Sequence, residues 1–172
     1  MKHSGTGYCS NVKLTIKLSQ TIVWVNEQDG LVDHMSSNII IRSGAYTLTQ
    51  YKKDKSCLHV TGVRNFGRIN KLCIFLSKRL TYTVDEIAKC VNINCSTWHA
   101  NVHHPLDLWS LFRKLPAVMM PKYIPTQFAG LTCKSGRVTV IIFSTGKMNF
   151  FGVKREPEYH SARINILFYV YS

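Results

Sequence analysis

Acidic residues are scarce in this chain of 172 residues, which carries nine Asp and Glu against 22 Lys and Arg, a formal net charge of +13. Twelve basic and six acidic residues precede residue 87, and ten basic and three acidic residues follow it, so both halves are basic. An even positive field favours a long polyanion, because the sequence-independent part of nucleic-acid affinity comes from such charge. The composition therefore indicates a nucleic-acid partner rather than a compact acidic substrate.

The chain also lacks long apolar runs and closely paired cysteines. No apolar run approaches the ~18 residues that a membrane span needs, so we expect no membrane role. None of the six cysteines forms a CxxC pair and no signal peptide precedes them, so we expect reduced thiols and an intracellular setting.

A zinc site is the metal centre to consider, since cysteines and histidines gather between residues 90 and 104. Their spacing fits no common zinc finger, and neighbouring positions of a strand point to opposite faces of a sheet. The residues concerned are Cys90, Cys95, His99, His103 and His104. We therefore predict no bound metal and no cofactor.

Catalytic groups are equally sparse. Hydrolytic and metal-dependent sites need clustered carboxylates, or a nucleophile beside a base. The acids stand instead in pairs near expected turns or helix ends: Glu27 with Asp29, Asp85 with Glu86, and Glu156 with Glu158. We predict that the protein is not an enzyme.

What the chain does contain is an internal repeat. Residues 135–154 return as an imperfect copy of residues 43–64, offset by 92 positions at the serine and by 90 at the glycine before the last basic residue. A period of half the chain indicates one structural unit used twice. We therefore expect two tandem repeats, residues 1–88 and residues 89–172, with pseudo-twofold symmetry.

Each repeat has the pattern strand, short helix, several strands, longer helix. In the first repeat, apolar alternation predicts strands over residues 9–18, 37–43, 45–51 and 56–62, with a helix over 66–80. In the second, we expect strands over 91–101, 127–134, 137–143 and 147–153, with a short helix over 106–112. A last helix begins near Pro157, because proline suits the first turn of a helix.

The alternation within the repeated hairpins separates two faces of a sheet. One face is expected to be core, and it holds Tyr46, Leu48, Leu58, Val60, Val138, Val140, Ile142, Met148 and Phe150. The opposite face holds Thr47, Thr49, Tyr51, His59, Thr61, Thr139, Ile141, Phe143, Asn149 and Phe151. An uncharged, partly apolar surface of this kind suits a flat partner.

These segments resemble the core of the TATA-box-binding protein family. Residues 123–131, YIPTQFAGL, are similar to the family's YEPELFPGL, and residues 141–154, IIFSTGKMNFFGVK, are similar to LIFSSGKMVxTGAK. Residues 105–111, PLDLWSL, are similar to PIRLEGL. The resemblance implies an α+β fold in which two tandem repeats form a curved antiparallel saddle, with helices on its convex face. The drift of the sequence suggests a viral or otherwise fast-evolving member.

The resemblance also implies intercalating residues. Phe128 and Phe143 align with two phenylalanines that wedge between base pairs, a form of kinking of which the TATA-box-binding protein is itself an example. Tyr51 takes the place of Phe143 in the first repeat, whereas the place of Phe128 falls near Met35 or Ser36. We therefore predict DNA intercalation by Phe128, Phe143 and Tyr51. The alternative is that the phenylalanines are core aromatics at a sheet edge.

A minor-groove surface follows from the same alignment. Asn92 or Asn94 stands near the family's central asparagine, and Thr61 matches a threonine that contacts the groove. The surface is completed by Thr49, His59, Ile141, Asn149 and Phe151. Phe151 replaces the second-repeat counterpart of that threonine, and His59 and Asn149 replace valines of the family, which loosens the distinction between A·T and G·C pairs.

Basic residues flank this surface in the alignment. Lys55, Arg64, Lys147 and Lys154 are predicted to contact phosphates, and the alternative is ordinary solvated charge. In the loop before Phe128, Ile124 and Thr126 replace two glutamates that transcription factor IIB recognises in this family. The resemblance therefore implies either a different partner or a lost contact.

Three functions are consistent with the sequence. The first is a transcription initiation factor that binds promoter DNA in the minor groove, bends it by aromatic insertion, and nucleates a preinitiation complex. Its partners would be a transcription factor IIB-like protein, other general factors and the RNA polymerase machinery. The second is an adaptor with weak or no DNA bending, and the third is a nucleic-acid packaging protein. We expect a location in the nucleus, or in the viral factory of an infected cell.

Overall fold

The structure, a computed structural model, describes residues 7–22, 31–35 and 37–172. The chain divides into two compact units. The N-terminal unit is Ser10–Asn94, and the C-terminal unit is Cys95–Ser172 with the segment that ends at Cys9. Strands β1 (Tyr8–Lys17) and β6 (Val91–Asn101) each contribute residues to both units.

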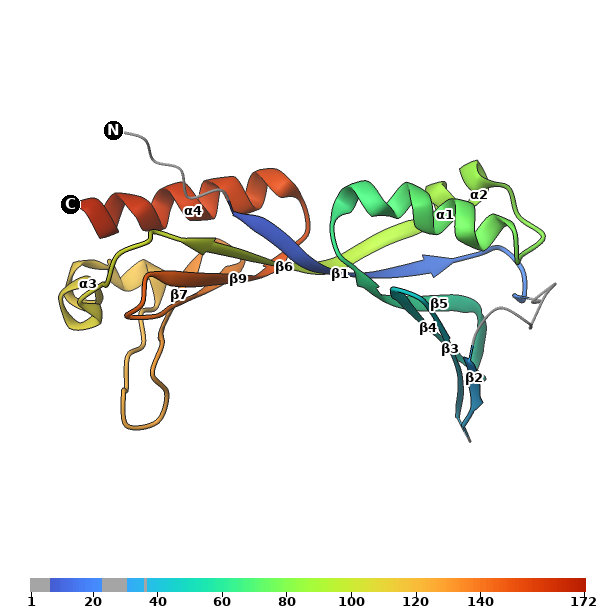
Figure 1. Cartoon of the computed structure of the whole chain (residues 1–172), viewed down its shortest axis with the longest axis horizontal. Helices are drawn as coiled ribbons and strands as arrows, with labels where there is room; N and C mark the ends of the chain where they lie inside the picture. The colour runs from blue at the N-terminus through green and yellow to red at the C-terminus, as the bar shows by residue number, and fades with distance from the viewer. Residues whose placement is uncertain (1–6, 23–30, 36) are drawn as a thin grey trace. The chain divides into compact units, whose positions relative to one another are not determined.

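The N-terminal unit is an antiparallel sheet with helices over one face (Figure 1). Its strands lie in the order β2-β3-β4-β5-β1. Besides β1 they are β2 (Leu31–His34), β3 (Asn38–Ser43), β4 (Tyr46–Tyr51) and β5 (Asp54–Val63). A 3-10 turn η1 (Phe66–Arg68) leads into α1 (Ile69–Ser77), and α2 (Val84–Lys89) follows.

Helix α1 buries the apolar row of this sheet. Val60 of β5 pairs with both Leu14 of β1 and Leu48 of β4, so the three side chains lie side by side on one face. All three are buried, as are Leu72, Cys73 and Leu76 of α1. The strands alternate with a period of two, so this burial leaves the intervening residues on the opposite face.

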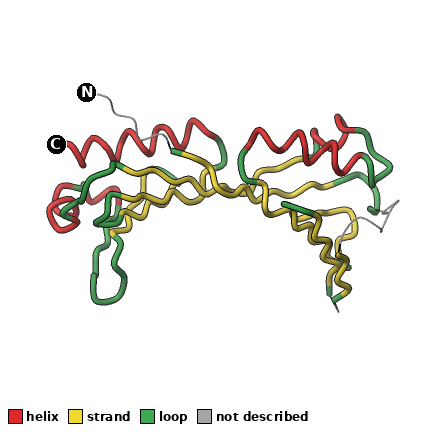
Figure 2. The backbone as a smooth tube through the Cα atoms, viewed as in Figure 1, coloured by secondary structure: helices red, strands yellow, loops and turns green. Residues whose placement is uncertain are grey.

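The C-terminal unit repeats the arrangement with longer helices (Figure 2). Its strands lie in the order β6-β9-β8-β7, all antiparallel where paired. They are β7 (Leu131–Ser135), β8 (Val138–Ile142) and β9 (Lys147–Val153) beside β6. Helix α3 (Leu108–Lys114) and the turn η2 (Ala117–Met119) precede β7, and α4 (Glu156–Tyr171) ends the chain.

An aromatic stack joins α4 to this sheet. The ring of Tyr159 lies parallel to that of Trp98, with centroids 4.3 Å apart, and meets Phe150 edge-on at 5.1 Å. Trp98 Nε1 donates to Ser96 Oγ, which donates in turn to the carbonyl of Val153. Large aromatic surfaces removed from water dominate core energetics, so this stack anchors the helix layer.

Most predicted elements are confirmed. The four repeated hairpin strands and the last helix are present, and the helix predicted over 66–80 is present as η1 and α1, which end at Ser77. Every residue predicted as core in the second repeat is buried, as are Leu48, Leu58 and Val60 in the first. Tyr46 is an error of the core prediction, because it is only half-buried and its ring lies against that of Phe75.

The strand predicted over 127–134 is wrong at its start, because β7 begins at Leu131. Residues 124–128 form a turn instead, in which the amides of Gln127 and Phe128 donate to the carbonyl of Ile124. Pro125 disfavours a strand there, since it has no amide hydrogen to donate.

Strand β2 and helix α2 were not predicted. The short helix expected between the first two strands of the first repeat falls mainly on residues 23–30, which lie outside the described residues. Helix α2 begins at a capping box in which Thr83 and Glu86 bond reciprocally to each other's backbone amides. Within the described residues, no helix combines the length and apolar content that crossing a membrane demands.

We predict that Tyr159→Phe stabilises the protein. The Tyr159 hydroxyl is buried without a hydrogen-bond partner among the described residues, and burial raises the pKa of its phenol. A buried unsatisfied hydroxyl costs about 1–3 kcal/mol, and the substitution removes it while keeping the ring. Urea denaturation should show a gain of about 1 kcal/mol in the free energy of unfolding.

Tyr171→Phe is the matched control, because Tyr171 is an exposed tyrosine of the same helix. Its free energy of unfolding should stay within error of the wild-type value. A loss of stability in Tyr159→Phe would show that the phenol has a partner and would contradict the prediction.

Candidate nucleic-acid interface

The C-terminal unit presents one uncovered sheet face opposite α4, here called the outer face. Cross-strand pairing defines it, since residues directly opposite each other on antiparallel strands share a face. One row joins Thr97, Phe151 and Thr139, and the next joins His99, Asn149 and Ile141. Phe151 is exposed and the other five are partly exposed, as the sequence predicted for those on β8 and β9.

Phe128 and Phe143 stand together at the edge of this face. Phe128 projects from the loop before β7 with 47% of its surface exposed, and Phe143 follows β8 and is half-buried. Their ring centroids are 6.1 Å apart and the rings are inclined at 68°. The sequence alternative of two core aromatics is wrong for Phe128, because so large an exposed fraction excludes a core position.

Gly130 makes this placement possible. A Cβ atom at Gly130 would lie 2.7 Å from the Phe128 ring and 2.8 Å from Ile141 Cγ2. A side chain at position 130 would therefore force the Phe128 ring or Ile141 to shift. Glycine at this position is compatible with the observed placement of Phe128 beside Phe143.

A tight turn fixes Phe143 relative to Lys147. The Phe143 amide donates to the Lys147 carbonyl, and the Gly146 amide donates to the Phe143 carbonyl, both at 2.9 Å. Gly146 has a φ of 84°, and a Cβ atom there would lie 2.4 Å from the His104 carbonyl oxygen. The glycine is therefore required, and the turn places exposed Lys147 at the start of β9 on the outer face.

His99 belongs to this surface although it was not predicted there. Its Nδ1 lies 2.7 Å from Asn149 Oδ1 and donates to it, since the amide oxygen only accepts. The Tyr8 ring lies 5.1 Å from the His99 ring. A register shift between Ser96 and Thr97 breaks the simple alternation of β6, so only the strand pairing could reveal which face His99 occupies.

The N-terminal unit has an outer face of similar layout. His59 pairs with Thr15 of β1 and with Thr49 of β4, and Thr61 pairs with Thr47 in the next row. These five side chains are all partly exposed. Small hydroxyl groups thus occupy positions where the C-terminal unit carries Ile141 and Phe151.

A hydrogen-bonded chain crosses this second face. Asn94 Nδ2 donates to Thr15 Oγ1 at 2.8 Å, and Thr15 Oγ1 lies 3.3 Å from His59 Nδ1. Tyr51, 45% exposed, meets the His59 ring edge-on with centroids 5.2 Å apart. The structure therefore brings predicted residues Asn94, His59 and Tyr51 together, whereas Asn92 is exposed without taking part in this chain.

The position equivalent to Phe128 has no aromatic ring in the N-terminal unit. Met35 is exposed in the turn between β2 and β3, where its amide donates to the Asn38 carbonyl, and Ser36 lies outside the described residues. A flexible thioether is softer and narrower than a phenyl ring. The two units therefore differ most at the position of Phe128, where the family resemblance implies an intercalating ring.

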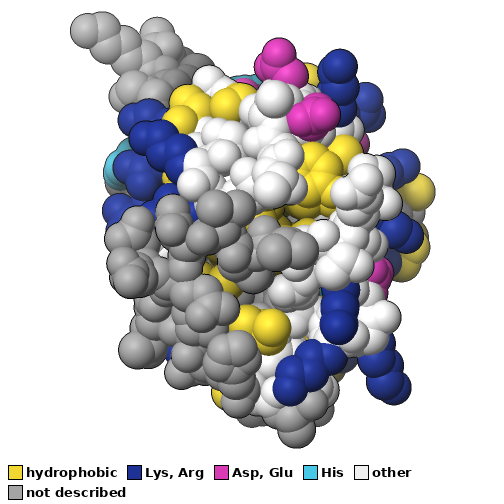
Figure 3. Space-filling view, turned by 90° about the vertical axis from the view of Figure 1, so that its right-hand side faces the viewer, with side chains coloured by type: hydrophobic (Ala, Val, Ile, Leu, Met, Phe, Trp, Pro, Cys, Tyr) yellow, Lys and Arg dark blue, Asp and Glu magenta, His cyan; other side chains and the backbone are white. Residues whose placement is uncertain are grey.

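The predicted phosphate contacts are all exposed cations. Lys55 and Lys147 lie near the starts of β5 and β9, while Arg64 and Lys154 directly follow the same two strands. Figure 3 shows Lys and Arg side chains at several edges of the N-terminal unit and few acidic ones. Contact with phosphates stays a prediction, and exposure leaves all four free to make it.

The cysteines and histidines considered as a zinc site are not assembled. Within the described residues, no three His, Cys, Asp or Glu side chains form a group that could hold a metal ion.

Three other cysteines are buried in the core. Burial raises the pKa of the Cys133 thiol to about 12, and burial also raises the pKa values of Cys57 and Cys73. These thiols are therefore protonated at neutral pH and behave as small apolar groups.

The acidic pairs among the described residues lie at helix N-termini, where Glu86 and Glu158 accept hydrogen bonds from backbone amides. Hydrogen bonds from the Thr83 amide and hydroxyl lower the pKa of Glu86, and the Lys154 amide lowers the pKa of Glu158. Asp107 caps α3 by accepting from the amides of Trp109 and Ser110. Carboxylates at helix N-termini satisfy amides that lack partners within the helix, so these groups have structural roles.

Comparisons with known proteins agree with this geometry. Residues 88–170 match the family described as transcription factor TFIID, or TATA-binding protein. A TATA-box-binding protein of Pyrobaculum calidifontis is 35% identical over 88 residues, which span 50% of this chain and 38% of that protein.

The fold extends the likeness to nearly the whole chain. Methanococcus jannaschii TBP superposes with a TM-score of 0.70 at 19% identity, covering 96% of this chain and 98% of that one. The family model matches residues 88–170, whereas the structural superposition also covers the first half of the chain. Residues 88–170 of this α+β chain therefore belong to a divergent form of the TATA-box-binding protein family, and the fold of a TATA-binding protein extends over nearly the whole chain.

Proposed function

We propose that this protein is a transcription initiation factor that binds promoter DNA through its outer faces and bends it. The observation that carries the proposal is the exposed pair Phe128 and Phe143, whose rings stand 6.1 Å apart at the edge of an uncovered sheet face. Aromatic side chains at a sheet edge insert between base steps and kink a duplex, as the TATA-box-binding protein itself does.

The composition of the outer faces supports a nucleic-acid partner. The rows named above hold threonines, histidines, an asparagine and apolar side chains, and no acidic residue. A mixed surface of this kind can lie against sugars and base edges in the shallow minor groove, while flanking cations meet phosphates. The formal charge of +13 adds sequence-independent attraction.

Polar groups on these faces point to a relaxed base preference. The Oδ1 atom of Asn149 accepts a hydrogen bond from His99. The amide NH2 group of Asn149 is therefore the part of this side chain that can donate to a partner. Every base pair offers acceptors in the minor groove, so a donor there separates A·T from G·C pairs poorly. We infer binding to A·T-rich promoters with weaker discrimination than a purely apolar surface gives.

An adaptor function is the second candidate, and Met35 favours it. A factor with an aromatic wedge in one unit alone bends DNA less than a factor with aromatic wedges in both units. Ile124 and Thr126, both exposed, stand where the family has glutamates that bind transcription factor IIB. We propose that the loop contacts an apolar partner surface in the transcription machinery, in a nucleus or a viral factory.

Replacement of both phenylalanines tests the main proposal. Phe128→Ala with Phe143→Ala should remove most of the bending, because no wedge then remains in the C-terminal unit and only Tyr51 is left in the N-terminal unit. Permuted-site gel mobility on an A·T-rich duplex selected from a random pool measures the bend angle. Phe168→Ala is the control, since Phe168 is an exposed phenylalanine of α4, on the opposite side of this sheet.

Unchanged bending in the double variant would rule out insertion by this pair. If the wild-type protein binds DNA without bending it, the adaptor function gains support. A random-pool selection that yields no consensus, together with charge-driven binding, would point to the packaging function.

Salt dependence tests the phosphate contacts. Lys147→Ala should reduce the slope of log K against log salt concentration by about 0.9, the value for one phosphate contact on duplex DNA. Lys71→Ala removes another exposed lysine, from α1, and should leave the slope unchanged. Fluorescence anisotropy between about 50 and 200 mM salt measures both. Equal slopes for Lys147→Ala and wild type would show that this lysine is only solvated charge.

A further inference from the structure

Helix α4 is apolar on two faces. Tyr159, Ala162 and Ile166 are buried against the sheet, as expected for a helix that covers one. On the outward side, Ile164, Phe168 and Tyr171 are 68%, 66% and 52% exposed. Their spacing of four and then three residues places them in one stripe along the helix. The outward face of such a helix is normally polar, so the stripe marks an interaction surface.

A groove runs beside this stripe. Phe168 and Val118 line a hollow of about 320 Å³ between α4, η2 and the turn from β7 to β8. A second hollow of about 440 Å³ continues toward the start of α4, and the two share Ser135, Gly136 and Asn165. We call these two hollows, with the stripe, the α4 groove.

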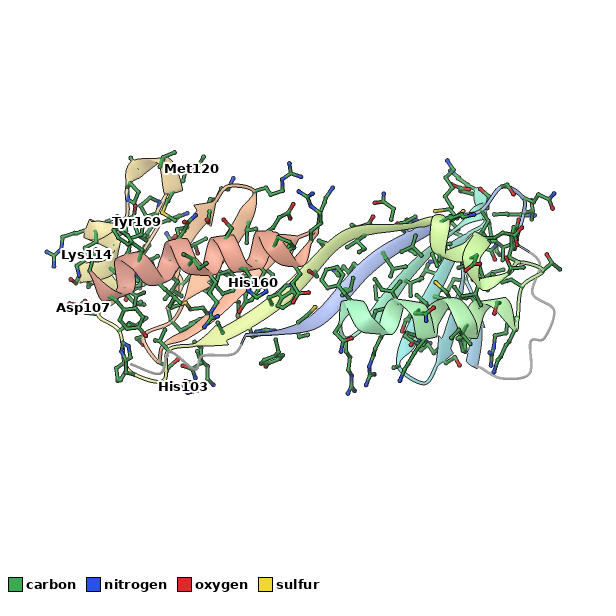
Figure 4. All side chains as sticks on the ribbon, turned by 90° about the horizontal axis from the view of Figure 1, so that it is seen from above. His103, Asp107, Lys114, Met120, His160 and Tyr169 are labelled. Carbon is green, nitrogen blue, oxygen red and sulfur yellow. The ribbon has the colours of Figure 1, made fainter. Side chains whose placement is uncertain are left out.

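Side chains at the C-terminal end of α4 extend this groove. In Figure 4, Lys114, Met120 and Tyr169 gather around that end of the helix, whereas His160 lies nearer its start. Tyr169 lines the first hollow, and Met120 is an exposed apolar side chain that follows η2. The apolar part of the groove therefore lies at the end of α4, away from its acidic first turn.

The charged residues along the groove are mainly cations. Lys134 lines the first hollow and Arg137 the second, while Arg163 adjoins Ile164 and Phe168. The acidic residue in the lining is Glu158, which forms an ion pair with Arg155 at 3.3 Å. Apolar contacts edged by cations complement a ligand with apolar contacts edged by anions.

We propose that the α4 groove binds an acidic amphipathic helix of a partner protein. An amphipathic helix lays its apolar side chains into a groove with spacings of three and four residues, which match the spacing of Ile164, Phe168 and Tyr171. Carboxylates on its flanks meet Lys134, Arg137 and Arg163. The 16 residues of α4 offer a track of about 24 Å, enough for four helical turns. This binding goes beyond the proposed DNA function and uses the opposite side of the sheet.

Charge decides against a second copy of this chain as the occupant. Two molecules that each carry a formal charge of +13 would bring like charges together at a groove already lined by cations. Such juxtaposition opposes association, whereas an acidic segment is attracted by the same residues. The acidic helix is therefore the occupant that the side chains of the groove favour.

A synthetic 16-residue peptide tests the proposal on the full-length chain. The peptide carries Leu and Phe at positions i, i+4 and i+7 with Glu at its flanks, and a comparison peptide has Lys in place of every Glu. Fluorescence anisotropy should show binding of the acidic peptide and none of the basic one. Phe168→Ala and Arg137→Glu should each weaken binding about tenfold or more, as loss of a central anchor does.

Two substitutions on α1 are the matched controls. Ile74→Ala removes an exposed apolar side chain and Lys71→Glu makes the same charge change as Arg137→Glu, and both should alter affinity less than twofold. Phe128→Ala should also leave peptide binding unchanged, which separates this proposal from the DNA function. Equal weakening by the controls would reduce the binding to nonspecific charge and overturn the proposal. Concentration-dependent dimerisation that Phe168→Ala abolishes, seen by sedimentation, would overturn it in favour of a second copy.

Discussion

The site depends on one constraint, the burial of alternate strand residues beneath α1 and α4. Phe150 is fully buried against Tyr159 of α4, so its neighbours Asn149 and Phe151 must point to the opposite face. A slip of one residue would exchange the two faces and expose the aromatic core. The cost of that exposure holds the register, and the register in turn fixes which side chains form each outer face.

This constraint explains what the sequence could and could not predict. Apolar alternation was enough to assign Ile141, Asn149 and Phe151 to the uncovered face, because β8 and β9 pair there without a bulge. It failed for His99, since the irregularity in β6 shifts the register at a point that no composition signal marks. It also failed at residues 127–130, where the loop follows from Pro125 and the close packing at Gly130 rather than from periodicity. Helix α2 had a readable signal in the pair Thr83 and Glu86, which matches a capping box.

The two units share a layout but differ in chemistry. The C-terminal outer face has Phe151 and the phenylalanine pair, whereas the N-terminal outer face has threonines, Tyr51 and an exposed methionine in the turn. Insertion needs a rigid ring that is already out of the core, and Phe128 in contact with Phe143 meets that need. Tyr51 is held edge-on by His59 and has a polar end that must find a partner. The larger part of any bending therefore falls to the C-terminal unit.

The exposed stripe of α4 can contribute free energy to the binding of a partner on the helical side of the sheet. Ile164, Phe168 and Tyr171 stay largely in contact with water after folding, so they add little to the stability of the unit. Their free energy of transfer is available only to an association that covers them. Since the outer-face residues of the C-terminal unit and this stripe lie on different sides of one sheet, a partner that covers one surface leaves the other accessible.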